Sequence, residues 1–430
     1  MKKTTDVAVV GGGLGGLAVA ALLARGGRRV TLFEKSKQLG GRAHTTEVEG
    51  YHFNLGPHAL YQGGPAVRVL GRLGVPMPGR IPRGEGSFAL RRGRLHTLPA
   101  GTVSLLTTDL LRAAGKLEFG RVMTSVMRVD ASRLEGTSLR EWLNAHVSRT
   151  EVREVMAAFF RVSTYCADAE ALGADAALSQ FQRARKGVRY LDGGWSGLVK
   201  ALAAAASGAG VEVETSAKVE SLEWDERGER PRVRGLRLAD GTEYEVGVVV
   251  VAGAPRDVAA LVPGDAVLAG WAEDAVPVKA ASLDVGLSRL PRPRTLFTLG
   301  MDRPWYASVH SEWARLAPEG GSVVHVAKYL GAGEAEASEQ ELEEVLDLVQ
   351  PGWREHVVTR RFLPGLTVMN ALPTKKKGLK GRPGPEVAHL GGLYVVGDWV
   401  GPEGMLADAS LASAESVARL LSREVGARAA

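Results

Sequence analysis

The stretch that decides the fold is DVAVVGGGLGGLAVAALLARGGRRVTLFEKSKQLGGR, residues 6–42. Asp6 to Val10 is short and apolar, which is typical of a buried strand. Leu17 to Arg25 is rich in Ala and Leu and predicts a helix, and Val30 to Phe33 predicts a second strand. The order strand, turn, helix, strand is that of a β-α-β unit.

Glycines fill the turn between the first strand and the helix. Gly11, Gly13 and Gly16 stand in G-x-G-x-x-G spacing. The first glycine permits a tight turn, the second lets the backbone approach a pyrophosphate, and the third lets helix and strand pack together. The N-terminus of the helix directs free N–H groups and a positive dipole end at the phosphates. Glu34 ends the second strand, where its carboxylate can accept hydrogen bonds from both ribose hydroxyls. We therefore predict a dinucleotide site; the alternative is a glycine-rich turn without a ligand.

The residues that follow Glu34 favour FAD over NAD. Val30, Glu34 and the triplet Gly40-Gly41-Arg42 match V-x-x-x-E-x-x-x-x-x-G-G-R. This pattern resembles the signature of the superfamily of flavin amine oxidases, protoporphyrinogen oxidases and phytoene desaturases. The resemblance implies that the Gly-Gly-Arg segment wraps the pyrophosphate and that Arg42 neutralises it through charge-assisted hydrogen bonds.

Three later segments resemble further blocks of the same superfamily. Asn54 to His58 resembles a block that passes close to the flavin ring. Tyr190 to Trp195 resembles the start of a G-G-x-x-x-L block, which is followed by a strand whose Val clamps the adenine through its backbone; Val219 is our candidate for that role. Leu393 to Asp398 resembles the C-terminal G-L-Y-x-x-G-D element.

The C-terminal element is expected to complete the flavin site. By the resemblance, Asp398 accepts hydrogen bonds from the ribityl chain. A helix predicted from about Leu406 to Arg423 begins beside Met405 and places N–H groups and its positive dipole end at the pyrimidine edge of the flavin. That arrangement stabilises negative charge on the reduced ring and raises its electron affinity.

Together these segments predict an α/β fold. A Rossmann-like FAD-binding domain of the glutathione-reductase type is assembled from residues 1–63, 190–262 and 378–430. An inserted α+β substrate domain comprises residues 64–189 and 263–377. In the first insertion Leu105 to Gly115 and Leu139 to Phe160 have helical periodicity. In the second, Ala280 to Leu287 and Ser322 to Tyr329 alternate and predict a mixed sheet over a binding cavity.

The predicted FAD contacts come from all three segments of the flavin domain. They are Gly11, Gly13, Leu14, Gly15, Gly16, Glu34, Lys35, Gly41, Arg42, Gly56, Pro57, His58, Val219, Gly397, Asp398, Met405 and Leu406.

Few other polar residues are expected at the flavin. His58 is the catalytic candidate, as a general base or a group that tunes the flavin; a structural histidine bonded to backbone is the alternative. Tyr61, Tyr306 and Trp399 are candidates to line the substrate pocket. We predict no metal site.

Composition and charge limit which cellular compartment and which partners fit the protein. The 430 residues contain one cysteine, Cys166, so no internal disulfide forms and a reducing, cytoplasmic compartment fits. The formal net charge is +6, with basic clusters at Arg91-Arg92-Gly93-Arg94 and at Lys375 to Lys377. These clusters are either solvated loops or sites that attract anionic lipid or an acidic carrier. Peripheral contact with a membrane is therefore one of the alternatives. No nucleic-acid motif is present.

The flavin would carry out the redox chemistry, and the protein would bind and orient the flavin and the substrate. The chain has one dinucleotide loop, so a second site for NADPH is not expected, and reoxidation falls to oxygen, a quinone or another acceptor. The resemblance implies non-covalent FAD, because the covalent amine oxidases have a Cys shortly before the C-terminal Gly-Asp. It also disfavours amine oxidation: those enzymes hold a water at N5 with a Lys soon after the strand before the second insertion, whereas the first lysine after Val251 is Lys279.

Three functions remain open. The first is desaturation or dehydrogenation of a small, lipophilic substrate, and the second is amine oxidation on the same scaffold. The third is non-enzymatic binding of lipidated partners, as in the escort proteins that resemble guanine-nucleotide dissociation inhibitors and share this fold without using flavin. Joint presence of Glu34, Arg42 and Asp398 disfavours the escort function.

Overall fold

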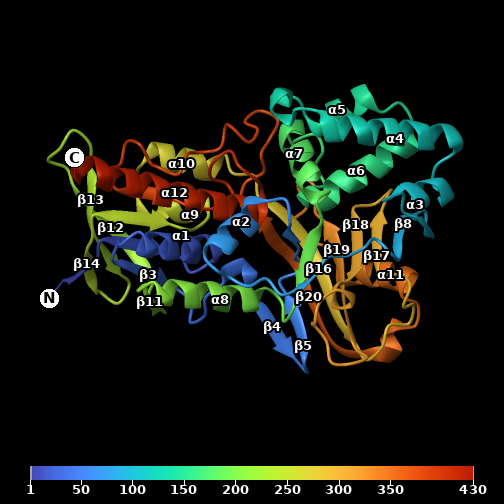
Figure 1. The fold of residues 1–430 in the computed structure, drawn as a ribbon, viewed down its shortest axis with the longest axis horizontal. Helices are drawn as coiled ribbons and strands as arrows, with labels where there is room; N and C mark the ends of the chain where they lie inside the picture. Colours follow the sequence, from blue (N-terminus) through green and yellow to red (C-terminus); the bar gives the residue numbers. More distant parts are fainter. Residues whose placement is uncertain (1, 430) are drawn as a thin grey trace.

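The computed structural model of the protein describes residues 2–429, with side chains as far as Arg423. Two lobes lie along the longest axis of the molecule (Figure 1). The left lobe holds both ends of the chain and a parallel sheet, and the right lobe holds a mixed sheet with a layer of helices above it.

The parallel sheet forms the centre of the left lobe. Its strands, in spatial order, are β11 (Glu212–Thr215), β3 (Val30–Glu34), β2 (Val7–Val10), β15 (Val248–Val251) and β21 (Leu393–Val395). All neighbours pair in parallel. The side chains of β15 are buried on both faces, which is why its sequence is an uninterrupted run of Val rather than an alternating pattern. The predicted β-α-β unit is present as β2, α1 and β3.

Helices cover one face of this sheet and a smaller sheet covers the other. On the first face lie α1 (Leu14–Arg25), α2 (Pro65–Arg72), α8 (Trp195–Gly208) and α12 (Leu406–Ala429). On the second lie β1 (Lys3–Thr4), β14 (Glu243–Glu245), β13 (Arg232–Leu238) and β12 (Val219–Asp225), with α9 (Pro255–Leu261) and α10 (Ala266–Glu273) beside them. The sheet is therefore shielded from water on both sides.

The mixed sheet forms the right lobe. Its order is β20 (Val357–Met369), β16 (Val278–Leu287), β19 (Ser322–Tyr329), β18 (Trp305–Val309), β17 (Phe297–Gly300), β8 (Ser87–Arg91) and β9 (Arg94–Thr97). β17 and β8 pair in parallel and the other neighbours are antiparallel. This confirms the mixed sheet expected from the two alternating segments. Helix α11 (Glu339–Val349) packs on it.

A helical layer completes the right lobe. It contains α3 (Thr102–Thr107), α4 (Ala113–Arg128), α5 (Leu139–His146), α6 (Thr150–Thr164) and α7 (Ala174–Ala184), which share one apolar core. The prediction of single helical stretches here was wrong in two places. The first breaks at residues 108–112, where the Thr108 hydroxyl is bonded to β9, and the second breaks where α5 ends and α6 begins.

Short elements join the lobes. They are β4 (Thr45–Val48) with β5 (Tyr51–Asn54), the three strands β6 (Leu60–Tyr61), β10 (Val188–Leu191) and β7 (Gly79–Arg80), and the 3-10 turns Gly41–Ala43, Ala131–Leu134, His310–Glu312 and Trp353–His356. The strands of the parallel sheet and of the mixed sheet come from the segments assigned to the two domains, but the boundaries themselves stay a prediction.

Candidate functional site

A cavity of about 860 Å³ lies where the two lobes meet. The glycine turn, the carboxyl ends of β3 and β15, and the start of α12 form its left part. Strands β16, β19 and β20, which belong to the right lobe, close its right part. Its volume lies in the range of pockets that hold cofactors and small molecules. At the carboxyl edge of an open parallel sheet, it occupies the usual position of a dinucleotide site.

Backbone packing explains the glycines of the turn. A Cβ at Gly16 would collide with the carbonyl oxygen of Gly11, and Gly11 itself has a φ of +109° beside the carbonyl of Ala252. At Gly13 the nearest heavy atom to such a Cβ is 4.0 Å away. Packing therefore requires glycine at the first and third positions, whereas Gly13 faces open space in the cavity, as a backbone that a ligand approaches closely would.

Glu34 is held with its carboxylate at the cavity wall. Its two oxygens accept hydrogen bonds from the backbone N–H of Gly12, at 2.7 Å, and of Ser36, at 2.8 Å. A carboxylate has about four acceptor sites, so lone pairs remain for the two hydroxyls of a ribose. This geometry fits the adenosine end of FAD.

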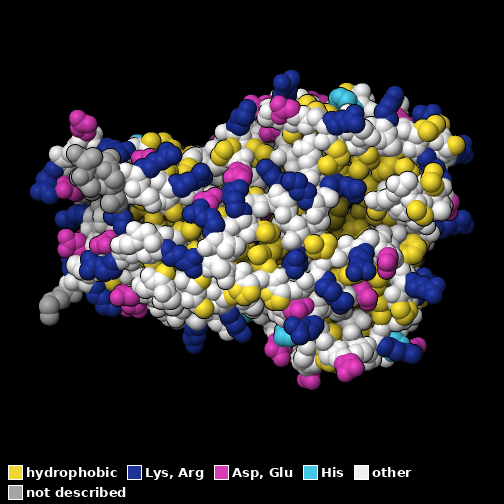
Figure 2. Space-filling model, viewed as in Figure 1, with side chains coloured by type: hydrophobic (Ala, Val, Ile, Leu, Met, Phe, Trp, Pro, Cys, Tyr) yellow, Lys and Arg dark blue, Asp and Glu magenta, His cyan; other side chains and the backbone are white. Residues whose placement is uncertain are grey.

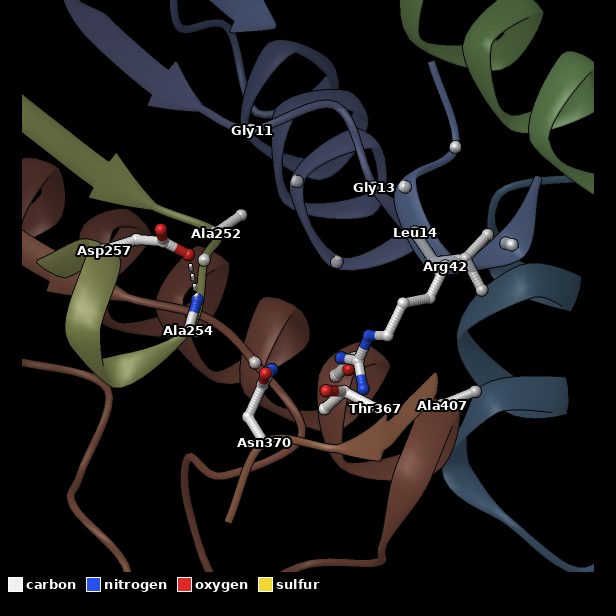
Figure 3. Close-up of a pocket in the computed structure, with 18 of the residues that line it drawn as sticks. Gly11, Gly13, Leu14, Arg42, Ala252, Ala254, Asp257, Thr367, Asn370 and Ala407 are labelled. Carbon is white, nitrogen blue, oxygen red and sulfur yellow. Dashed lines mark hydrogen bonds between the residues drawn. The ribbon is translucent and has the colours of Figure 1, made fainter. Parts of the chain in front are cut away.

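Arg42 extends across the cavity toward the end of β20 (Figure 3). Its guanidinium donates to Asp398 at 2.7 Å and to the carbonyl oxygen of Val368 at 2.8 Å. Asn370 donates to the same carboxylate from its backbone N–H and its amide, both at 3.0 Å. Asp398 is fully buried and stands behind these groups, whereas Arg42 and Asn370 line the cavity. The unit places the guanidinium of Arg42, whose charge Asp398 balances, and a fixed amide where a dinucleotide would pass.

The opposite end of the cavity lies beside β12 and α9. Val219 and Leu261 line it. Asp257, in the first turn of α9, accepts a hydrogen bond from the backbone N–H of Ala254 at 2.9 Å (Figure 3). The direct adenine contact of Val219 stays a prediction.

His58 lies on the cavity wall with both ring nitrogens against backbone carbonyls. Nδ1 is 3.1 Å from the oxygen of Gly56, and Nε2 is 3.1 Å from the oxygen of Arg42. Burial lowers the pKa of His58, although these two carbonyls raise it. The edge of its ring packs on Trp195 with centroids 5.0 Å apart. Since neither nitrogen is free for a substrate, this geometry favours the structural function of His58 over a general base.

A buried polar network supports the loop that carries His58. Asp284 accepts hydrogen bonds from His325 Nδ1 at 2.7 Å and from Arg361 at 2.6 Å, and Arg361 also donates to the carbonyl oxygen of Asn54. Burial raises the pKa of Asp284, but His325 and Arg361 outweigh it and lower the pKa overall. The network ties β16, β19 and β20 to the loop. Sequence analysis missed it because its members are 36 to 77 positions apart and form no local motif.

The right part of the cavity has an apolar and aromatic wall. It is lined by Tyr61, Tyr165, Ala280, Ala327, Leu363 and Leu366. The hydroxyl of Tyr61 donates to the carbonyl of Ser163 at 2.9 Å, and that of Tyr165 donates to the carbonyl of Pro57 at 3.1 Å. Tyr165 has a φ of 58°, a strained conformation that turns its ring at the end of α6. Both phenols are thus bonded to backbone.

Two residues predicted for this wall do not line the cavity. Tyr306 does not line the cavity, because its hydroxyl is bonded to His310 at 3.0 Å inside the sheet core. Trp399 does not line it either, because its indole N–H donates to the carbonyl of Gly253 at 2.9 Å and its ring packs on Trp271. Tyr61 is the candidate that lies on the wall.

Most of the predicted cofactor residues meet in the cavity. Those that line it are Gly11, Gly13, Leu14, Gly15, Gly16, Glu34, Lys35, Gly41, Arg42, Pro57, His58, Val219, Gly397 and Leu406. Gly56, Asp398 and Met405 do not line it. Gly56 packs on Ser282 and Leu366, and Met405 is fully buried in the core of the helical layer. Any contribution of these three residues to cofactor binding would have to be made through neighbouring residues that line the cavity.

Asp408 is a further residue of the site that no sequence motif predicts. This residue is in the first turn of α12 and belongs to the cavity wall. One of its oxygens accepts the backbone N–H of Ala66 at 3.0 Å, at the start of α2, and the other has no hydrogen-bond partner among the described residues. Burial raises the pKa of Asp408 to about 6. No motif contains this residue, and an Asp in a first helical turn has the ordinary signature of a cap.

Comparison with known proteins decides the family. Residues 14–421 match the family model of flavin containing amine oxidoreductases. The chain belongs to this family. It is therefore a member of a group of oxidoreductase enzymes that includes desaturases and oxidases.

Curated relatives are similar over parts of the chain. A phytoene desaturase of Cercospora nicotianae is 28% identical over 283 residues, which are 58% of this chain and 45% of that protein. A putative flavin-containing monoamine oxidase of Mycobacterium tuberculosis is 33% identical over 172 residues, 38% of this chain and 37% of that protein. The matches thus span less than half of these relatives.

Solved structures share the fold over nearly the whole chain. An oxidoreductase from Methanosarcina mazei superposes with a TM-score of 0.77 at 20% identity, covering 96% of this chain and 100% of that one. A RAB GDI from Plasmodium falciparum gives a TM-score of 0.64 at 12% identity, with 97% and 98% covered. These likenesses confirm the predicted α/β fold.

Proposed function

We propose that this protein is an FAD-dependent oxidoreductase that takes a hydride from an apolar small molecule, as a desaturase or dehydrogenase does. The observation that carries the proposal is the wall built by β16, β19 and β20, which contributes no charged side chain to the cavity. When bound, FAD would accept the hydride at N5. The chain's own groups hold the cofactor, exclude water and orient the substrate.

The residues present fit FAD. Gly13 leaves room for a close backbone approach, Glu34 keeps lone pairs for a ribose, and Arg42 with Asn370 presents positive charge and an amide donor beside the cavity. The Rossmann-like domain built from three segments, with its two insertions, is part of this proposal, and so are the individual cofactor contacts.

FAD is proposed to be non-covalent. The single cysteine, Cys166, is buried, and it does not line the cavity. Its Sγ lies 3.5 Å from the carbonyl oxygen of Asp168, and burial raises its pKa to about 12. It therefore stays a protonated, packed thiol rather than an attachment point. Oxygen, a quinone or another acceptor would reoxidise the flavin.

Amine oxidation is the second candidate, and one observation favours it. Asp408 is an acid on the cavity wall with one unpaired oxygen, which a protonated amine could approach. Against this, Lys279 does not line the cavity, whose lysines are Lys35 and Lys218, beside Glu34 and Val219 rather than on the substrate wall. The escort function is less supported, because an escort protein that does not use flavin has no use for residues that bind ribose and pyrophosphate.

The purified protein's visible spectrum is the first test. We expect flavin bands whose colour passes into the supernatant after heat or acid precipitation, and anaerobic bleaching by apolar alkanes or alkenes but not by amines. Bleaching by amines alone would reject the desaturase proposal in favour of amine oxidation. A colourless protein that also fails to take up added FAD would reject both.

The basic cluster Lys375–Lys377 gives little support to membrane or acidic-carrier binding. Lys375 pairs with Glu141 and Glu170, and Lys377 pairs with Asp274. No helix in the described part of the chain has the length and apolarity needed to cross a bilayer. A peripheral contact would have to use another surface.

A further inference from the structure

The most exposed apolar side chains of the molecule gather in one place. Val103, Leu106 and Leu117 expose 74%, 69% and 78% of their surface. Every other exposed large hydrophobic side chain that the structure describes has 47% or less exposed. All three lie on α3 and the first turns of α4, two helices at the right end of the molecule in Figure 1. Figure 2 shows hydrophobic side chains at the surface of that end.

These side chains do not pack into the hydrophobic core. Helix α3 has no fully buried residue, and α4 uses its opposite face for packing, through Phe119, Val122 and Val126. The Nζ of Lys116 donates to the carbonyl of Leu106 at 2.6 Å, so the end of α3 lies beside the start of α4. Val103, Leu106 and Leu117 therefore form one apolar face, which we name the α3–α4 face.

Helix α4 and its N-cap residue carry four basic side chains near the α3–α4 face. The basic side chains of residues 100–128 are Arg112, Lys116, Arg121 and Arg128. None of these forms an ion pair with any residue for which side chains are described. The two acids of the segment are engaged: Asp109 pairs with His96, and Glu118 is buried and bonded to Arg149. Cations without an ion-pair partner, on the same helix as protruding apolar side chains, match an anionic lipid surface.

We propose that the α3–α4 face docks this protein on an anionic lipid bilayer. Shallow insertion of a few apolar side chains needs only a small patch, whereas a stable protein interface uses about 20–30 residues on each side. Three protruding side chains at one end of a long molecule are enough for shallow insertion into lipid, but too few for a stable protein interface. The proposal goes beyond the redox function and does not depend on the substrate.

Vesicle sedimentation tests the proposal without turnover. The flavin-loaded protein is mixed with vesicles of phosphatidylcholine and phosphatidylglycerol in equal parts, and with phosphatidylcholine alone. We expect binding to the mixed vesicles that weakens with salt. Leu106→Gln with Leu117→Gln should lower the partition constant by about tenfold or more, and Arg112→Glu with Arg121→Glu should do the same through charge.

Matched controls lie elsewhere on the surface. Val267→Gln with Val276→Gln changes two side chains that are each 47% exposed, and Arg237→Glu with Lys200→Glu makes the same charge change; both should bind as the parent does. Since all these positions are exposed or at the surface, flavin content and melting temperature should stay unchanged. Parental binding by the Leu106→Gln/Leu117→Gln variant would overturn the proposal, and so would failure of the parent to bind either vesicle. Self-association without lipid that the same two substitutions abolish would instead make the face a dimer contact.

Discussion

Glu34 has its orientation fixed by two backbone donors, one from the glycine turn and one from the residue after β3. Replacing it with arginine removes the acceptors for a ribose and puts a cation against the N–H of Gly12. We expect Glu34→Arg to purify without flavin, measured as the ratio of visible to protein absorbance. Glu226→Arg, the same charge change on an exposed loop, should stay yellow. A yellow Glu34→Arg protein would contradict the site assignment.

Asp398 organises its surroundings more than it contacts a ligand. Its removal would leave Arg42 and the amide of Asn370 without their shared acceptor. Asp398→Ala should lower the free energy of unfolding by roughly 2–4 kcal/mol and raise the dissociation constant for FAD, while the fold persists. Denaturant unfolding and flavin titration measure the two effects. Normal flavin occupancy in this variant would reject a cofactor role for Asp398.

At the residue scale, the sequence predicts side chains that belong to a local motif. Gly11, Gly13, Gly16 and Glu34 are fixed within one β-α-β unit, so their spacing reveals them. Tyr306 and Trp399 were assigned without such a motif, and their positions depend on which side of a strand faces the core. Contacts across the chain, such as Asp284 with Arg361, leave no local pattern to read.

At the element scale, Asp408 in the first turn of α12 allows the effect of burying a carboxylate on stability to be tested. The folded-state pKa of Asp408, about 6, lies above the value of about 3.9 for an unfolded chain. Ionised Asp408 therefore destabilises the fold, with a penalty that is absent below pH 4 and complete above pH 6. We expect Asp408→Asn to raise the free energy of unfolding at pH 7.5 by up to about 3 kcal/mol, with no gain at pH 4.

The bond to the N–H of Ala66 can persist in this variant, because asparagine keeps a carbonyl acceptor. Thermal unfolding across pH 4 to 8 measures the difference. A constant difference between the two proteins over this range would contradict a raised pKa. Asp240→Asn is the control: that carboxylate is exposed in a hairpin turn, and bonds to Thr242 lower its pKa, so no stabilisation is expected.

Elements were predicted best where one periodicity dominates. Helix α1, rich in Ala and Leu, and the strands β2 and β3 on either side of it are found where expected, within a few residues. The helix predicted from Leu105 to Gly115 was not, because its residues belong to α3, to a non-helical stretch and to the start of α4. Leu106 on α3 is exposed, whereas Leu110 and Leu111 are buried in the stretch between the two helices.

At the scale of the whole molecule, the cavity joins segments that are far apart in the chain. Gly13, Val219 and Leu406 all line it. A ligand that spans them should stabilise the folded state by mass action, by about 4 kcal/mol at a thousandfold excess over its dissociation constant. We expect the flavin-free protein to melt at a lower temperature, and added FAD to restore it in a concentration-dependent way. Adenosine alone should restore less. A melting temperature indifferent to FAD would contradict the assembly of the site from distant segments.

The state of Cys166 has a practical consequence for labelling the protein. Because the only sulfhydryl of the chain is buried and stays protonated at neutral pH, maleimide reagents should leave the native protein unmodified. A cysteine introduced at any exposed site would then be the single attachment point for a fluorophore or spin label. The protein can thus be probed by distance and environment spectroscopy without first removing a native thiol.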